Sequence, residues 1–330
     1  MKFVHIALYD ASIVDGRVLP YAAKSERMVL MSLKKKLKRY WPLYLFILPA
    51  LAYILIFCYG PMYGIQIAFK NYNPALGMAK SPWVGFLHFE SFFKSFYFSR
   101  LITNTFTLSI YTIVVGFPIP ILLALMLNEV RNRRYRSFLQ TVLYAPHFVS
   151  MVVMVGIITT MLSPSLGVIN HILELFGMER VYFLIMPKAF RHIYVWSDVW
   201  QQMGWNAIIY TAALSTVDPE LHEAAMIDGA SRIKRIWHVN LPLILPTIII
   251  TLILRIGSIA TVGYEKAFLL QNDLNSEVSE IISTYVYKRG IVGGQFSLTT
   301  AIGLFNNLIN VCMLLLANKL AGKFSETSLF

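Results

Sequence analysis

The chain has 330 residues, of which 57% are hydrophobic and 14% charged, and its formal net charge is +12. Soluble globular proteins are about 45–50% apolar and about 25% charged, so the composition indicates a chain surrounded by lipid. The positive charge does not indicate nucleic-acid binding, because the basic residues flank long apolar segments instead of forming a separate stripe. Cys58 and Cys312 both fall in apolar segments, which excludes a disulfide framework and a CxxC metal site.

We expect residues 1–40 to form a cytoplasmic N-terminal extension. The first residues, MKFVHIALYD, lack the continuous apolar core of a cleavable signal peptide, and Asp10, Asp15 and Glu26 interrupt the sequence that follows. Residues 1–33 are interpreted either as poorly ordered or as an amphipathic helix on the membrane surface, since a basic run ends the segment.

A helix needs about 20 mostly apolar residues to cross a bilayer, and six stretches within residues 41–322 meet or approach this length. They cover residues 43–68, 105–127, 141–162, 193–217, 243–263 and 299–318. The fourth stretch is the least apolar, because four polar residues interrupt it: Asp198, Gln201, Gln202 and Asn206. The sequence therefore predicts an all-α integral membrane protein with six transmembrane helices and a short cytoplasmic tail over residues 323–330.

Lys and Arg are distributed unevenly over the predicted loops. Eighteen of the 29 lie on one side of the predicted membrane and ten on the other, with Arg255 inside a span. Because cytoplasmic loops carry the excess of Lys and Arg, both termini and the loop over residues 218–242 are predicted to be cytoplasmic.

The loop over residues 218–242, DPELHEAAMIDGASRIKRIWHVNLP, has the start and stop signals of two short helices. Asp218 can cap the first helix, Pro219 suits its first position, and Gly229 can provide a left-handed stop. Ser231 can begin the second helix, and Pro242 is expected to end it before the fifth span. The pattern predicts a compact pair of helices lying flat under the membrane.

This loop resembles the EAA loop of permeases in binding-protein-dependent ABC importers, whose pattern is E-A-A, three residues, Gly, nine residues and I-x-L-P. The chain matches it apart from Val239, which replaces isoleucine. In that family the loop docks into a cleft on the ATP-binding subunit. The resemblance therefore implies a coupling role for Glu223, Ala224, Ala225, Asp228 and Gly229. The alternative is an amphipathic interfacial helix without a protein partner.

The resemblance extends over about residues 38–322, where GIQIAFKNYNP, WVGFLHFESFF and NTFTLSI are similar to the sugar and oligosaccharide branch of the family. It implies the type I ABC importer permease fold, with residues 41–322 as the permease domain, in a bacterial inner membrane. The implied partners are a second homologous permease, two ATP-binding cassette subunits and a soluble solute-binding protein. The implied cargo is an oligo- or polysaccharide, with an anionic, alginate-like chain among the candidates.

The sequence contains no GxxxxGK[ST] motif to hold nucleotide phosphates, and no cluster with catalytic or metal-binding spacing. We therefore expect a translocation subunit, not an enzyme, with no cofactor or metal of its own and with ATP and Mg on partner subunits. The alternatives are an ion-coupled secondary transporter of a polar solute, for which no inverted repeat is obvious, and a membrane enzyme of glycan or lipid metabolism.

Seven residues in the predicted spans are candidates for the substrate pathway: Arg255, Asp198, Gln202, Asn206, Trp200, Asn306 and Asn310. An ionised side chain at mid-bilayer costs about 2.5–3.5 kcal/mol, so Arg255 is expected either to anchor a polar or anionic substrate or to pair with an acceptor such as Asp198. The residues at 198, 202 and 206 form one polar stripe, which either lines an aqueous cavity or forms hydrogen bonds between helices. The asparagines at 306 and 310 form a similar pair, for which helix packing is the alternative role.

Overall fold

The computed structural model describes residues 38–324 and 329. The predicted extension and tail therefore lie almost wholly outside the described residues. The described part is helical, and its single β-type contact is an isolated antiparallel bridge between Lys70 and Trp83. The chain divides into two compact units, one up to Gly64 and one from Ile65 onwards.

In the first unit, residues 38–53 form an α-helix that is followed by the π-helix η1 (Ile54–Tyr59) and by the start of the 3-10 helix η2 (Gly60–Phe69). Together, Lys38–Phe69 form a 32-residue apolar helix that is long enough to cross a membrane. The change of helix type occurs next to Pro61, which has no N–H to donate to the preceding turn.

The second unit begins with two short helices, α2 (Gly77–Lys80) and α3 (Leu87–Phe93). They precede α4 (Tyr97–Gly116) and α5 (Pro118–Asn128), which together form the candidate span Tyr97–Asn128. Pro118 stands at the first position of α5, where a missing N–H disturbs the helix least. The predicted second span, residues 105–127, lies within this helix.

The third predicted span, residues 141–162, is not one straight helix. The chain forms α6 (Arg133–Tyr144), the 3-10 turn η3 (Ala145–Phe148) and α7 (Met151–Met161), with a bend of 97° between the two α-helical arms. Pro146 cannot donate a helical hydrogen bond, and the Ser150 hydroxyl accepts a hydrogen bond from Val153 N at 3.4 Å and so caps a new helix.

The short helices α8 (Val168–Leu175) and η4 (Phe183–Ile185) lead to the central helix α9 (Pro187–Ser215). α9 packs against α4, α5, α6 and α12, and its buried side chains contribute to two of the hydrophobic clusters. At Gly204, a Cβ atom would lie 2.0 Å from the carbonyl oxygen of Leu143, so the backbones of α9 and α6 are in direct contact.

After α9 come α10 (Pro219–Ile227), α11 (Arg232–Arg235), the π-helix η5 (Ile236–Asn240) and α12 (Leu241–Ile256). The remaining elements are α13 (Tyr264–Leu270), α14 (Ser276–Ser279), α15 (Ile282–Val286), the π-helix η6 (Tyr287–Val292) and α16 (Phe296–Phe324). The predicted fifth span, residues 243–263, is wrong at its end, because the helix stops at Ile256 and turns follow.

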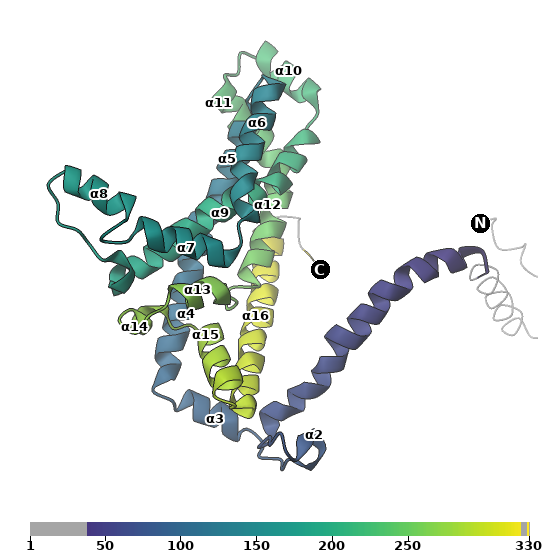
Figure 1. Ribbon diagram of the computed structural model, residues 1–330. Helices are drawn as coiled ribbons and strands as arrows, with labels where there is room; N and C mark the ends of the chain where they lie inside the picture. Colours follow the sequence, from purple (N-terminus) through teal and green to yellow (C-terminus); the bar gives the residue numbers. More distant parts are fainter. Residues whose placement is uncertain (1–37, 325–328, 330) are drawn as a thin grey trace, which may run out of the picture. The chain divides into compact units, whose positions relative to one another are not determined.

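Among the described residues, four helices are long and apolar enough to cross a membrane, or five if the bent pair is one span. The predicted count of six is therefore not confirmed. The predicted fourth span corresponds to α9, which has the necessary length but is not one of these helices. In the second unit, α10 and α11 lie at one end, and α3 lies near the opposite end (Figure 1).

Candidate functional site

α10 is fixed at both ends by the caps that the sequence predicts. Asp218 Oδ1 accepts a hydrogen bond from Glu220 N at 3.0 Å. Gly229 has a φ of 75°, and Ala230 N donates to the carbonyl oxygen of Ala225 at 2.9 Å. A positive φ is favourable for glycine and costly for residues with a Cβ. The first half of the loop is therefore a defined helix with a sharp stop.

The coupling residues implied by the EAA resemblance are accessible. Glu223, Ala224, Asp228 and Gly229 are exposed, and Ala225 is half-buried. Large apolar side chains beside them are also exposed: Leu221, Met226, Ile227 and Ile233. Exposed apolar side chains at the tip of a unit are typical of a protein–protein contact, but the coupling role of these residues stays a prediction.

The second helix of the loop does not end at Pro242, as the sequence suggested. α11, η5 and α12 form one continuous helix from Arg232 to Ile256, and Pro242 lies in the first turn of α12. The π-helical turn directly before the proline accommodates its missing N–H. Within this turn, Asn240 is fully buried, and neither its Oδ1 nor its Nδ2 atom has a hydrogen-bond partner.

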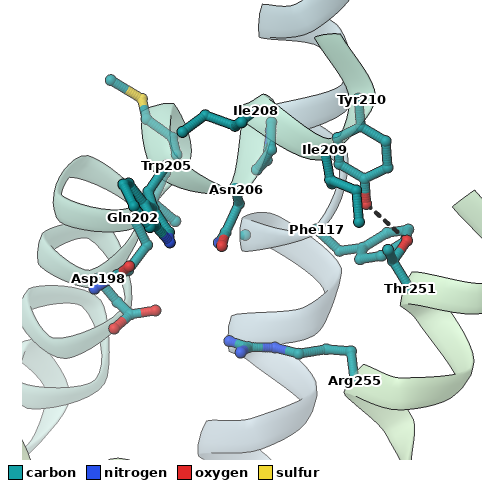
Figure 2. Close-up of a pocket in the computed structure, with 14 residues that line it drawn as sticks. Phe117, Asp198, Gln202, Trp205, Asn206, Ile208, Ile209, Tyr210, Thr251 and Arg255 are labelled. Carbon is teal, nitrogen blue, oxygen red and sulfur yellow. Dashed lines mark hydrogen bonds between the residues drawn. The ribbon is translucent and has the colours of Figure 1, made fainter. Parts of the chain in front are cut away.

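Two adjoining cavities of about 450 Å³ each lie in the second unit between α4, α5, α9, α12 and α13. Four of the predicted pathway residues line both cavities: Asp198, Gln202, Asn206 and Arg255. Figure 2 shows the polar stripe of α9 facing the side chain of Arg255, which reaches across from α12. The structure thus brings the stripe and the arginine to one space that is large enough to hold a small ligand.

Asp198 pairs with a lysine that the sequence analysis did not single out. Lys266 Nζ of α13 donates to Asp198 Oδ1 at 2.7 Å and lies 4.6 Å from the centre of the Tyr194 ring. The Lys266 side chain is 1% exposed. Lys266 stands in a predicted loop, 68 residues away from its partner, so no local pattern signals that it is buried.

Arg255 does not form the pair with Asp198 that the sequence offered as an alternative. Its side chain is exposed to the cavities, and it has no ion pair among residues 38–324 and 329. Since Lys266 pairs with Asp198, Arg255 is the charged side chain of the first cavity that has no ion-pair partner in the described part of the chain, whereas the second cavity is also lined by Glu265.

An aromatic surface adjoins the polar stripe. His147 Nδ1 and Gln202 Oε1 are 2.9 Å apart, and the rings of His147 and Trp205 stack with a centroid distance of 4.2 Å. Trp205 lines the first cavity, whereas Trp200, the predicted aromatic contact, lines neither cavity. Trp205, one of whose faces is covered by His147, lines the first cavity together with Phe117 and Tyr210.

Asn306 and Asn310 are occupied by packing contacts. Asn306 Nδ2 donates to the carbonyl oxygen of Ala260 at 3.1 Å, and Asn310 Oδ1 accepts from Ala260 N at 2.9 Å. Asn310 Nδ2 also donates to Thr261 Oγ1 at 2.8 Å. These bonds join α16 to the turns after α12, and neither asparagine lines either of the two cavities described above.

Residues 116–325 match the family described as binding-protein-dependent transport system inner membrane component. The chain is similar to the polygalacturonan/rhamnogalacturonan transport system permease protein YteP of Bacillus subtilis (strain 168). The two are 43% identical over 307 residues, which cover 93% of this chain and 94% of that protein. Protein LplB of the same organism is 45% identical over 294 residues, which cover 89% of this chain and 92% of that protein.

The fold is also similar to one chain in the crystal structure of a bacterial alginate ABC transporter in complex with an alginate pentasaccharide-bound periplasmic protein. The TM-score is 0.82 and the sequence identity is 43%. The match covers 89% of this chain and 99% of that chain.

Proposed function

The chain belongs to the family of binding-protein-dependent transport system inner membrane components, and on this premise we propose that it forms part of the path of an acidic saccharide through an ATP-driven importer. It is a permease subunit with the type I ABC permease fold, and not an enzyme. The charge of Arg255, which lacks an ion-pair partner in the lining of the first cavity, is the observation that supports an acidic cargo most directly.

The names of similar proteins agree with this cargo. YteP is named for polygalacturonan and rhamnogalacturonan, and the solved transporter is described as importing the acidic polysaccharide alginate. All three polysaccharides contain uronate residues, whose carboxylates are planar anions that a guanidinium binds through paired hydrogen bonds. Trp205 offers a face for the sugar ring next to the polar stripe.

The ATP-driven step takes place on other subunits in this proposal. Two ATP-binding cassette subunits hold ATP and Mg, and one of them docks at α10, where Glu223 and Gly229 are exposed. A second, homologous permease supplies the other part of the path, and a soluble solute-binding protein delivers the saccharide at the opposite end. The excess of Lys and Arg in one set of loops supports placing α10 and both termini on the cytoplasmic side of a bacterial inner membrane.

Docking of the loaded binding protein and binding of ATP act together only if both favour the same conformation of the permease. A ligand shifts the equilibrium between two conformations only through its different affinities for them. An ion-coupled secondary transporter is not favoured, because the chain belongs to a family of binding-protein-dependent systems.

The test of the cargo uses the complete complex reconstituted in vesicles with its binding protein. ATPase stimulation is measured with oligogalacturonate, oligoalginate and a neutral maltodextrin. We expect the acidic chains to stimulate hydrolysis most, and the Arg255→Gln variant to weaken their effect about tenfold, since a hydrogen bond to a charged group is worth about 1.5–3 kcal/mol. Stronger stimulation by the maltodextrin in the wild type contradicts the acidic cargo.

The test of the docking role is co-purification. The ATPase subunit that docks at α10 should purify with the wild-type permease and be lost from the Glu223→Arg/Gly229→Val variant. Lys94, an exposed residue directly after α3, provides a control, because α3 lies near the end of the unit opposite α10 and Lys94→Gln changes a charge there. Retention of the ATPase by the double variant contradicts docking at α10.

A further inference from the structure

A group of cations surrounds a single carboxylate beside the short helix α14. Arg100 Nη2 is 2.7 Å from Glu280 Oε2, and Lys288 Nζ is 3.7 Å from Glu280 Oε1. Two further arginines lie on neighbouring elements, Arg191 on α9 and Arg289 on η6. We call these five residues, Arg100, Arg191, Glu280, Lys288 and Arg289, the α14 cation cluster.

Two members of the α14 cation cluster have no carboxylate partner among the described residues. Arg191 Nη2 donates to Asn104 Oδ1 at 3.2 Å, and Asn104 in turn donates to the carbonyl oxygen of Glu280 at 3.1 Å. The Arg289 guanidinium lies over the rings of Tyr97 and Tyr285, at 5.8 Å and 5.6 Å from their centres. The cluster thus holds four cations against one carboxylate.

The cations of the cluster are also incompletely bonded. The Nε atoms of Arg100 and Arg191 are buried and have no hydrogen-bond partner in the described part of the chain. Like charges held close together repel one another, more strongly at a partly buried site than in water. A carboxylate that enters the cluster relieves this repulsion and is a suitable acceptor for guanidinium groups.

The cluster adjoins the cavity that contains Arg255. The ring of Tyr287, which precedes Lys288 on η6, lies 5.1 Å from the ring of Tyr264, and Tyr264 lines the second cavity. In Figure 1, α13, α14 and α15 lie on the side of α9 that faces away from α10. With α10 on the cytoplasmic side, the cluster is on the outer side, where Lys and Arg are normally depleted. The Tyr287–Tyr264 pair thus connects η6, which carries Lys288 and Arg289, with the wall of the second cavity, which Arg255 also lines.

We propose that the α14 cation cluster binds carboxylates of the incoming saccharide before they reach Arg255, and this proposal rests on the acidic cargo proposed above. Arg191 and Arg289 provide the binding charge, whereas Arg100 and Lys288 are partly neutralised by Glu280. The tyrosines at positions 97 and 285 offer ring faces between the charges. The cluster acts as an entry site that selects for acidic chains.

The test compares tetragalacturonate with its methyl ester, in which each carboxylate is replaced by a neutral ester group. Uptake is measured with the complete complex in vesicles, at saturating concentrations of loaded binding protein, so that capture by the binding protein does not limit the rate. In the Arg191→Gln/Arg289→Gln variant, we expect uptake of tetragalacturonate to fall about tenfold and uptake of the ester to change less than twofold. The Arg191→Lys/Arg289→Lys variant keeps both charges and should retain most of the uptake, and Lys94→Gln should behave as wild type.

A second measurement needs neither uptake nor the ester. The purified complex without binding protein is titrated with tetragalacturonate at low and high salt. The wild-type Kd should rise with salt, and the Arg191→Gln/Arg289→Gln variant should bind about tenfold more weakly, with a smaller salt dependence.

Three outcomes overturn the proposal: an unchanged Kd, unchanged uptake of tetragalacturonate, or an equal loss of uptake for both substrates. An equal loss is expected if the arginines only support the fold or contact the binding protein. A wrong proposal for the cargo gives a different result. In that case the wild-type complex itself takes up neutral oligosaccharides in preference to tetragalacturonate.

Discussion

The ion pair between Lys266 and Asp198 is expected to show an unequal response to the loss of each partner. Lys266 is 1% exposed and Asp198 is 22% exposed. Removing one partner of a buried pair costs about 3–5 kcal/mol, because the other charge remains without compensation. Asp198→Asn leaves a fully buried ammonium group, so its cost should lie near the upper end of this range. Lys266→Met leaves a carboxylate that still reaches water, so its cost should lie near the lower end.

The double variant Asp198→Asn/Lys266→Met leaves no unpaired charge and should be more stable than either single variant. The assay is the apparent unfolding midpoint of the purified complex, followed by size-exclusion chromatography after heating. The three variants give a double-mutant cycle, and a large coupling is expected for groups in direct contact. If the two single effects simply add in the double variant, the pair does not carry the proposed energy and the reasoning is wrong.

Three further predictions concern backbone contacts and turns. Gly204→Ala should prevent normal assembly, because the new Cβ meets the Leu143 carbonyl oxygen at 2.0 Å. Gly303→Ala is the control, since its Cβ meets nothing within 4 Å, and it should be neutral or stabilising by about 0.5–1 kcal/mol. A normal yield and a normal melting temperature of the Gly204→Ala variant refute the contact. Asn170 is fully buried and bonds to backbone groups of Leu162 and Ser163 before α8 and of Val181 after it. Asn170→Leu should therefore make that loop accessible to protease while the complex still assembles, and protection equal to wild type contradicts this. Gly229→Ala should destabilise the coupling loop by about 1–2 kcal/mol, because alanine is strained at the φ of 75° that Gly229 adopts. The loss is measured as faster amide hydrogen exchange in α10, and unchanged exchange argues against a strained turn.

The features that the sequence predicts correctly are local ones. The Asp218 cap and the Gly229 stop depend on side chains within a few residues of the backbone groups they serve, and both are present in the structure. The permease assignment is confirmed by the family match. The polar stripe of α9 was visible because a helix repeats every 3.6 residues, which places positions 198, 202 and 206 on one face.

The features that the sequence misses depend on breaks inside apolar runs and on distant partners. Hydropathy continues across residues 145–150, although Pro146 and Ser150 turn the chain there by 97° between the flanking helices. The helix likewise ends at Ile256, while apolar residues continue beyond it. Lys266 joins the second cavity only because α13 packs against α9, 68 residues away from its partner Asp198, so no single segment reveals it.

The contact at Gly204 limits how this permease can change shape. Two helix backbones that touch without intervening side chains cannot slide or tilt past each other without a collision, since packed interiors deform little. α6 and α9 should therefore move as one rigid body. The conformational change between outward-facing and inward-facing states must then occur at irregular segments outside this pair of helices. The turn at residues 145–150 and the π-helical segment at Ile236–Asn240 are two irregular segments at which the backbone can bend.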